Sequence, residues 1–479
     1  MVPNVTVELF SDWNSIYLAI QNNLYLYIPL LTMGLMSREY SSGSIKLLYS
    51  SPLGGIKVIF GKYLSILIFA VVMMGTVIPL ITFTMFKVES ADFTFMLSGL
   101  LGLTLLMFAY SAIGLYMSIL TSYQVVAAMC TLGVLALLNN FGSIGQEVEF
   151  LRDVTYWLSL RGRADKFITG LITSEDIMYF IVVIFIFLSL SVIKLNSDKS
   201  KESLVKLSLK YASVMMIAMI FAYLSSNPKM VLYYDASQVK ANTLTKNSQD
   251  IIDSLESKLK VITYVNMADN NFHYAIPRTL NTDKKRFYHY TRFIPSIKME
   301  YVYYFDEPMQ NRNYQAGVTS AEDLARQYTK PYKIDFEKVL KPNEIREHID
   351  LFSEGNTFVR VLQTPDGKST FLRIFNDMQK HPGESEISGA LKRLVGDVPR
   401  VVFTTGSGEP SISKAGEADF TNFSVTRSNR AALINQGYDV CALDLGNHTY
   451  DIIKDTADIL VLADPKEMIA GDDLVKILK

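Results

Sequence analysis

Long apolar runs recur through the first 225 residues of this chain, and they constrain its fold more than any other feature. A helix of about 20 apolar residues can cross the hydrocarbon core of a bilayer, which is about 30 Å thick. The average hydrophobic content of 49% conceals a division, because residues beyond about 226 alternate short apolar runs with polar segments. The sequence therefore predicts a polytopic α-helical membrane domain followed by an α/β domain.

Six apolar segments are predicted to span the lipid bilayer. Pro79 is expected to kink the second of them. The third contains Gly99, Gly102 and Gly114, small residues that let helices approach closely. The six predicted spans are residues 16–36, 58–86, 95–120, 125–141, 178–193 and 209–225, and the last has residue 204 as an alternative start.

Residues 142–177 are too rich in charge to cross a bilayer. Charged and apolar side chains are mixed along this stretch, which predicts one or two amphipathic helices at the outer membrane surface. A loop that lines the path of a substrate is the alternative, and the sequence does not separate the two.

Residues 37–62 form a polar, basic interlude between the first two apolar segments. Four basic residues outweigh Glu39, which places the loop on the cytoplasmic side. Ile45 and Leu48 lie three positions apart and so share one face of a short helix, which the Pro- and Gly-containing segment 51–55 ends. An exposed apolar face on such a loop is typical of an interaction site. The basic residues are Arg38, Lys46, Lys57 and Lys62.

Alternation of the spans from this cytoplasmic loop predicts the remaining topology. The turn at 121–124 and the lysine-rich loop at 194–208 both fall inside, and the lysines of the second agree with the positive-inside tendency. Residues 226–479 fall outside, so the second part is expected to be an extracytoplasmic α/β domain. The predicted division is a membrane domain at 1–203, a transmembrane anchor at 204–225 and the α/β domain at 226–479.

The second half shows short strand-like runs that alternate with helical patterns, which favours a parallel sheet. Thr364-Pro365-Asp366-Gly367 separates two such runs and predicts a hairpin turn. The expected strands are 231–234, 261–265, 299–305, 357–362, 371–374, 401–404, 440–443 and 459–462. The expected helices are 249–258, 278–294, 384–395 and 422–436, the last with Gly437 as its C-cap.

The 37–62 loop resembles a coupling element of the membrane subunits of ABC-2-type exporters. The family pattern is Glu-x-x-x-Gly-[ST]-[IL]-x-x-Leu-x-x-[ST]-Pro with a later Gly-Lys, and Lys46 stands where many relatives have an acidic residue. The resemblance implies that a separate ATP-binding subunit contacts Glu39, Gly43, Ile45, Leu48 and Pro52. An ordinary cytoplasmic loop of another membrane protein is the alternative. The pattern is met by Glu39, Gly43, Ser44, Ile45, Leu48, Ser51, Pro52, Gly61 and Lys62.

Most of residues 205–479 resembles the auxiliary component of bacterial gliding-motility-type ABC exporters, in which one span anchors a large periplasmic α/β domain. The segments that carry this resemblance include 401–409, 437–440 and 457–465. The resemblance to these two families implies a further span before Met1, and it implies a continued sheet with another span after Lys479. The chain is therefore expected to be truncated at both ends.

Gly406-Ser407-Gly408-Glu409 follows an expected strand, at the kind of loop where α/β sheets bind ligands. Its amides are candidates for cradling an anion or a sugar hydroxyl. Ser407 as a nucleophile and a purely structural glycine turn are the alternatives. The motif lacks the Gly-x-Ser-x-Gly pattern, and the family often has His where Ser407 stands, so no catalytic residue is assigned.

No phosphate-binding Gly-x-x-x-x-Gly-Lys-[ST] motif occurs, so ATP hydrolysis is assigned to the partner chain. The two cysteines and five histidines lack ligand spacing, which predicts no metal and no cofactor. A net charge of −1 gives no indication of nucleic-acid binding.

The leading hypothesis is the permease subunit of an ABC-2-type exporter in the inner (cytoplasmic) membrane, with a homo- or hetero-dimeric membrane domain. One alternative is a membrane-anchored extracytoplasmic binding or scaffold protein of a cell-surface or gliding-type machinery. A membrane-bound hydrolase that uses Ser407 is a further alternative.

Overall fold

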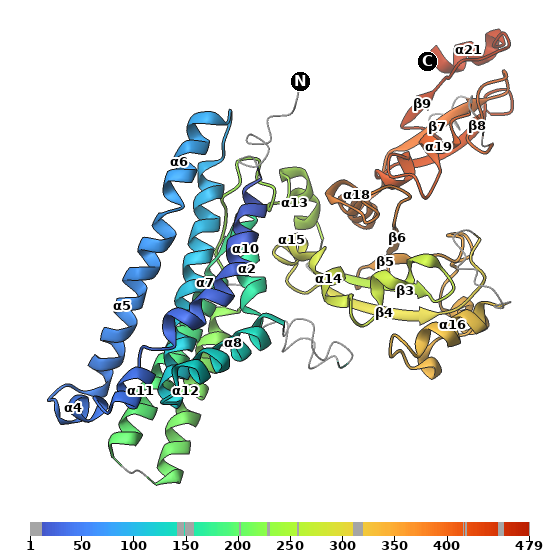
Figure 1. Ribbon diagram of the computed structural model, residues 1–479. Helices are drawn as coiled ribbons and strands as arrows, with labels where there is room; N and C mark the ends of the chain where they lie inside the picture. Colours follow the sequence, from blue (N-terminus) through green and yellow to red (C-terminus); the bar gives the residue numbers. More distant parts are fainter. Residues whose placement is uncertain are drawn as a thin grey trace. The chain divides into compact units, whose positions relative to one another are not determined.

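The computed structural model describes residues 12–140, 148, 158–200, 203–227, 230–255, 258–309, 320–414, 416, 419–448 and 455–478. The chain divides into two compact units, Met1–Thr243 and Leu244–Lys479. The first is helical and the second contains two sheets (Figure 1). The predicted assignment of 1–203, 204–225 and 226–479 to permease, anchor and auxiliary domain stays a prediction.

The helical unit contains four helical stretches that are long and apolar enough to cross a membrane: Gly55–Lys87, Phe93–Leu120, Ser174–Lys199 and Leu204–Ser225. This confirms a polytopic membrane domain. Two further predicted spans form helices outside that set, because one has only 17 residues and the other contains Gln21, Asn22 and Asn23. The helices are α2 (Trp13–Thr32), α5 (Gly55–Gly75), α6 (Ile78–Lys87), α7 (Phe93–Leu120), α8 (Gln124–Asn140), α11 (Ser174–Lys199) and α12 (Leu204–Ser225).

The expected kink at Pro79 is a short break between α5 and α6. Helix α5 ends at Gly75, and Pro79 lies in the first turn of α6. Proline has no backbone N–H to donate, and its ring clashes with the preceding turn, so the first turn of a helix is its favoured helical position. The two helices therefore follow one another with an interruption (Figure 1).

Helix α7 lies at the centre of the unit and contacts α2, α5, α8, α10 and α11. Its glycines are the points of closest approach. A Cβ atom on Gly99 would lie 2.3 Å from Tyr17, one on Gly102 would lie 2.3 Å from Phe167, and one on Gly114 would lie 2.1 Å from Thr32. The prediction that these small residues permit close helix packing is confirmed.

The stretch between α8 and α11 contains one described helix, α10 (Leu160–Ile168). Leu160, Ala164, Phe167 and Ile168 of α10 are buried, while Arg161 is exposed, so the predicted amphipathic character holds for this segment. The rest of the prediction for 142–177 falls largely outside the described residues.

A two-stranded antiparallel sheet joins the chain after α12 to the α10–α11 connection. Strand β1 (Leu171–Thr173) pairs with β2 (Tyr233–Asp235), although only the second was expected from the sequence. The Asp235 carboxylate accepts hydrogen bonds from the backbone N–H groups of Ser237 (3.0 Å) and Asn242 (2.8 Å). The strand pairing, together with a bond from the Asn242 side chain to the Thr169 carbonyl at 2.8 Å, attaches the segment after α12 to the α10–α11 connection.

The second unit confirms the α/β class, but only one of its two sheets is fully parallel. The sheet β8-β7-β9 is parallel throughout, whereas in β4-β3-β5-β6 only β3 and β4 run parallel. The predicted hairpin at 364–367 accounts for one of the antiparallel pairs, because its turn, with Gly367 at φ +88°, reverses the chain between β5 and β6. The strands are β3 (Lys260–Asn266), β4 (Lys298–Tyr304), β5 (Val359–Gln363), β6 (Ser369–Arg373), β7 (Arg400–Thr405), β8 (Asp439–Asp444) and β9 (Ile459–Val461).

The helix expected at 384–395 is present as α18 (Glu384–Val395), and the one expected at 278–294 is split in two. The prediction of one helix at 422–436 is wrong, since only two short helical turns lie in this stretch. The Asn435 amide donates to the carbonyls of Thr426, Arg427 and Asn429, and such side-chain bonds compete with a helix. The remaining helices are α13 (Lys246–Asp253), α14 (Leu280–Lys285), α15 (Tyr288–Thr291), α16 (Ala321–Thr329), α17 (Pro342–His348), α19 (Thr421–Ser424), α21 (Gly471–Leu478) and the 3-10 turns η2 (Asn270–Ala275), η3 (Phe336–Lys338) and η4 (Leu433–Asn435).

Candidate functional site

The 37–62 loop folds into two short helices, α3 (Ser37–Ser42) and α4 (Ile45–Ser50), before α5 begins at Gly55. Gly43 separates them with φ +76°, a left-handed conformation that glycine adopts without steric cost. The resemblance requires a glycine at this position, and the structure supplies the conformational reason.

Glu39 is bound within its own chain. Its carboxylate pairs with Lys62 Nζ at 2.9 Å and accepts a hydrogen bond from the Ser44 hydroxyl. The Ser44 hydrogen bond, followed by the Lys62 ammonium, lowers the pKa of Glu39. The carboxylate that was expected to contact the ATP-binding subunit therefore already ties α3 to α5.

Ile45 and Leu48 face the core of the helical unit. Ile45 is 7% exposed and belongs to a cluster with Ile59 of α5 and Leu115 of α7, and Leu48 is half-buried against the same cluster. The expectation that this face of the helix is exposed is wrong, because α4 folds back against the ends of the longer helices. Contact between these residues and a partner stays a prediction.

The opposite side of α4 is exposed and was not assigned from the sequence. Leu47 is 73% exposed, Leu53 is 47% exposed, and Lys46 and Pro52 are exposed beside them. We call these four residues the α4 outer surface. Helical spacing places Leu47 and Leu48 on different sides of α4, but only contacts with α5 and α7 decide which side faces outward.

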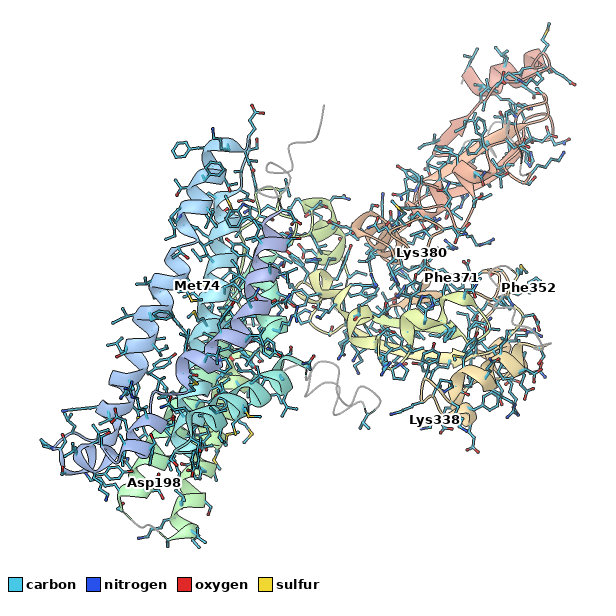
Figure 2. All side chains as sticks on the ribbon, in the orientation of Figure 1. Met74, Asp198, Lys338, Phe352, Phe371 and Lys380 are labelled. Carbon is cyan, nitrogen blue, oxygen red and sulfur yellow. The ribbon has the colours of Figure 1, made fainter. Side chains whose placement is uncertain are left out.

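Besides the Glu39–Lys62 pair, a second side-chain bond connects the 37–62 loop to the membrane helices, here to α11. The Tyr40 hydroxyl donates to Asp198 Oδ2 at 2.9 Å, and Lys194 pairs with the other oxygen at 2.7 Å. Figure 2 labels Asp198 near the end of α11, close to the short helices of the loop. Through Lys62 and Asp198, the loop is attached to two of the helices that are long enough to span a membrane.

The turn at 406–409 lies at the carboxyl end of β7, with Gly406 at φ +116° and Gly408 at φ +75°. The backbone N–H of Ser407 donates to Glu409 Oε2 at 2.7 Å, so the turn's own carboxylate occupies that amide. The Ser407 carbonyl accepts from the amides of Lys466 and Glu467, both at 2.9 Å. These bonds favour a structural turn, and a ligand at this turn stays a prediction.

Residues 24–148 match a family model described as ABC-2 family transporter protein. The match includes α3, α4 and the α4 outer surface, and it lies wholly within the helical unit. No curated protein and no solved structure matches the chain. The match supports an ABC-2-type permease, a membrane component of a transporter rather than its catalytic part, and the four apolar helical stretches agree with a multi-pass membrane protein.

Proposed function

We propose that this chain is the permease subunit of an ABC-2-type exporter, fused to an auxiliary α/β domain and driven by a separate ATP-binding subunit. The match at 24–148, which includes a loop with an exposed apolar surface, is the observation that carries this proposal. The membrane unit works as a homo- or hetero-dimer in the inner membrane. The α/β unit lies in the periplasm and serves as a gliding-type auxiliary component.

The contacts of the loop suggest how it transmits force. Leu47 and Pro52 meet the ATP-binding subunit, and Gly43 provides the turn between α3 and α4. Ile45 and Leu48 hold α4 against the membrane helices from behind. A displacement of α4 then reaches α5 and α11 through the bonds of Glu39 and Tyr40.

Leu47→Asp is expected to abolish co-purification of the ATP-binding subunit and its stimulated ATPase activity. Burying a leucine side chain stabilises an interface by about 1.5–3 kcal/mol, a tenfold or larger change in affinity. Because Leu47 is 73% exposed, the folded permease is expected to be unaffected. Pull-down and ATPase measurements on the purified complex test this.

Leu232→Asp is the matched control, since Leu232 is 75% exposed and lies outside the loop. Ser407→Ala is also expected to keep ATPase stimulation near wild type. Normal recovery of the ATP-binding subunit with Leu47→Asp would refute the coupling role of the α4 outer surface.

The topology is tested with two exposed serines in a chain whose Cys130 and Cys441 are replaced by serine. A cysteine at Ser254, in the α/β unit, is expected to react with an impermeant thiol reagent in intact spheroplasts. A cysteine at Ser42 is expected to react only after the membrane is opened. Labelling of the Ser42 variant from outside contradicts the cytoplasmic assignment of the loop.

A further inference from the structure

A cleft of about 370 Å³ opens at one edge of the mixed sheet in the α/β unit. It is lined by Asn271, which follows β3, by Met309, which follows β4, and by residues 353–355 and 357–359, which lead into the start of β5. Carboxyl ends of parallel strands are where α/β sheets commonly bind ligands, and small-molecule sites start at about 300 Å³. The cleft is separate from the turn at 406–409, which does not line it.

A buried ion pair positions one arginine at the wall of this cleft. The Glu354 side chain is 4% exposed and receives two bonds from Arg373, at 2.6 and 2.7 Å. Arg427 Nε binds the same carboxylate at 3.2 Å. Since Arg373 also donates to Asn435 at 3.0 Å, each of its three guanidinium nitrogens has a hydrogen-bond partner.

Arg427 is therefore the arginine at this wall whose guanidinium has terminal nitrogens available to a ligand. Its side chain is 53% exposed, and among the described residues only its Nε has a hydrogen-bond partner. The two terminal nitrogens of a guanidinium held in this way match the two oxygens of a carboxylate or phosphate. The bond to Glu354 holds the Arg427 guanidinium in place before a ligand binds, and this lowers the entropic cost of binding.

The wall behind the cleft adds positive charge. Phe358 lines the cleft, and the Arg360 guanidinium lies 4.9 Å from the centre of its ring. Arg360 is fully buried and pairs with Asp283, but its Nε and Nη1 have no hydrogen-bond partner among the described residues.

The charges around the cleft and its wall favour an anion. Two arginines, 360 and 286, share the carboxylate of Asp283, and two more, 373 and 427, share that of Glu354. A further carboxylate behind the wall, Asp269, accepts the Phe358 and Asn271 amides, and burial raises its pKa. A cleft with an excess of cations concentrates anions from solution.

Apolar side chains make up part of the remaining lining, beside polar ones such as Asn271, Thr426 and Ser428. Phe358, Met309, Ile374 and Val425 contribute side chains to the cleft. Such a surface excludes water from the apolar body of a ligand, while a few polar groups set its orientation.

We propose that this cleft binds a small organic anion, a carboxylate or phosphate on an apolar body, with the oxyanion on the terminal nitrogens of Arg427. This activity of the α/β unit goes beyond the proposed permease function and does not depend on it. The apolar body lies against Phe358 and Val425.

Calorimetric titration of the full chain in lipid nanodiscs tests the proposal with three probes. Phenylacetate and phenyl phosphate supply the two oxyanions on one apolar body, and phenylacetamide is the neutral isostere. At least one anion is expected to bind saturably, at least about tenfold tighter than the amide. The ratio of the two anions distinguishes a carboxylate from a phosphate ligand. Failure of both anions to bind, or equal binding of the amide, overturns the proposal.

Arg427→Gln is expected to lower the affinity for the anion by about tenfold or more and to leave the affinity for the amide unchanged. Asn376→Asp, at an exposed cleft position, adds a negative charge with little change of shape. This charge repels an anion, so the substitution is expected to lower the affinity for the anion as well. Arg326→Gln is the matched control, because Arg326 is 59% exposed and also pairs with one glutamate. Unchanged anion affinity in both cleft variants, with folding verified by thermal melting, refutes the assigned site.

Discussion

Gly114→Val is expected to prevent the helical unit from folding in a single, well-packed form. A Cβ at position 114 would lie 2.1 Å from Thr32 Oγ1 and 2.6 Å from Thr32 Cβ, closer than real Cβ contacts occur. Thr32 is fully buried and its hydroxyl donates to the Ile28 carbonyl at 2.9 Å, so it has no free space to occupy. We expect a destabilisation of about 3 kcal/mol or more, the upper end of overpacking costs.

The measurement is the melting temperature and the monodisperse fraction of the protein in detergent. Gly133→Val is the control, since Gly133 lies in α8 and a Cβ there meets nothing within 4 Å. Gly102→Val is expected to behave like Gly114→Val because its Cβ would lie 2.3 Å from Phe167. Equal melting of the position 114 and position 133 variants would show that α2 and α7 do not pack as described.

Asp283→Asn is expected to destabilise the α/β unit by about 3–5 kcal/mol. The substitution leaves the guanidinium of Arg360 without a countercharge at a position that is fully buried. Two nitrogens of this guanidinium already lack a hydrogen-bond partner among the described residues. The Tyr301 hydroxyl, which donates to Asp283 at 3.0 Å, would also lose its ionic acceptor.

Hydrogen exchange of β3 and β5 in the full chain, with and without denaturant, measures this loss. Glu322→Gln is the control, because it breaks the exposed pair with Arg326 and is expected to cost at most about 1 kcal/mol. The double variant Arg360→Met, Asp283→Leu is expected to recover part of the stability, since the cost arises from an unpaired buried charge. A single-variant loss no larger than that of Glu322→Gln would contradict the buried pair.

Several local elements follow directly from sequence patterns. The long apolar runs become α5, α7, α11 and α12, because only helices satisfy every backbone group in hydrocarbon. The strand ending before Gly406 and the hairpin at 364–367 follow from short apolar runs and turn residues. Helix α18 has the bounds that its pattern predicts.

Other elements depend on groups that are distant in sequence. Residues 422–436 carry a helical pattern, but Arg427 binds Glu354 and Arg430 binds Asp377, 73 and 53 positions away. Strand β1 has only three residues and exists because the chain returns after α12 to pair with it. Local helix and strand propensities do not depend on such distant partners and therefore cannot predict them.

The sequence by itself determined the class of this protein, because hydrophobic length and charge bias are local properties that a bilayer selects directly. It also located the 37–62 loop and the glycines of α7. Only the tertiary structure decided that Ile45 faces inward and Leu47 outward, since both sides of α4 carry apolar residues and burial depends on which helix ends lie beside them. The same holds for the cleft at Arg427, which five separate segments of the chain form by meeting in space.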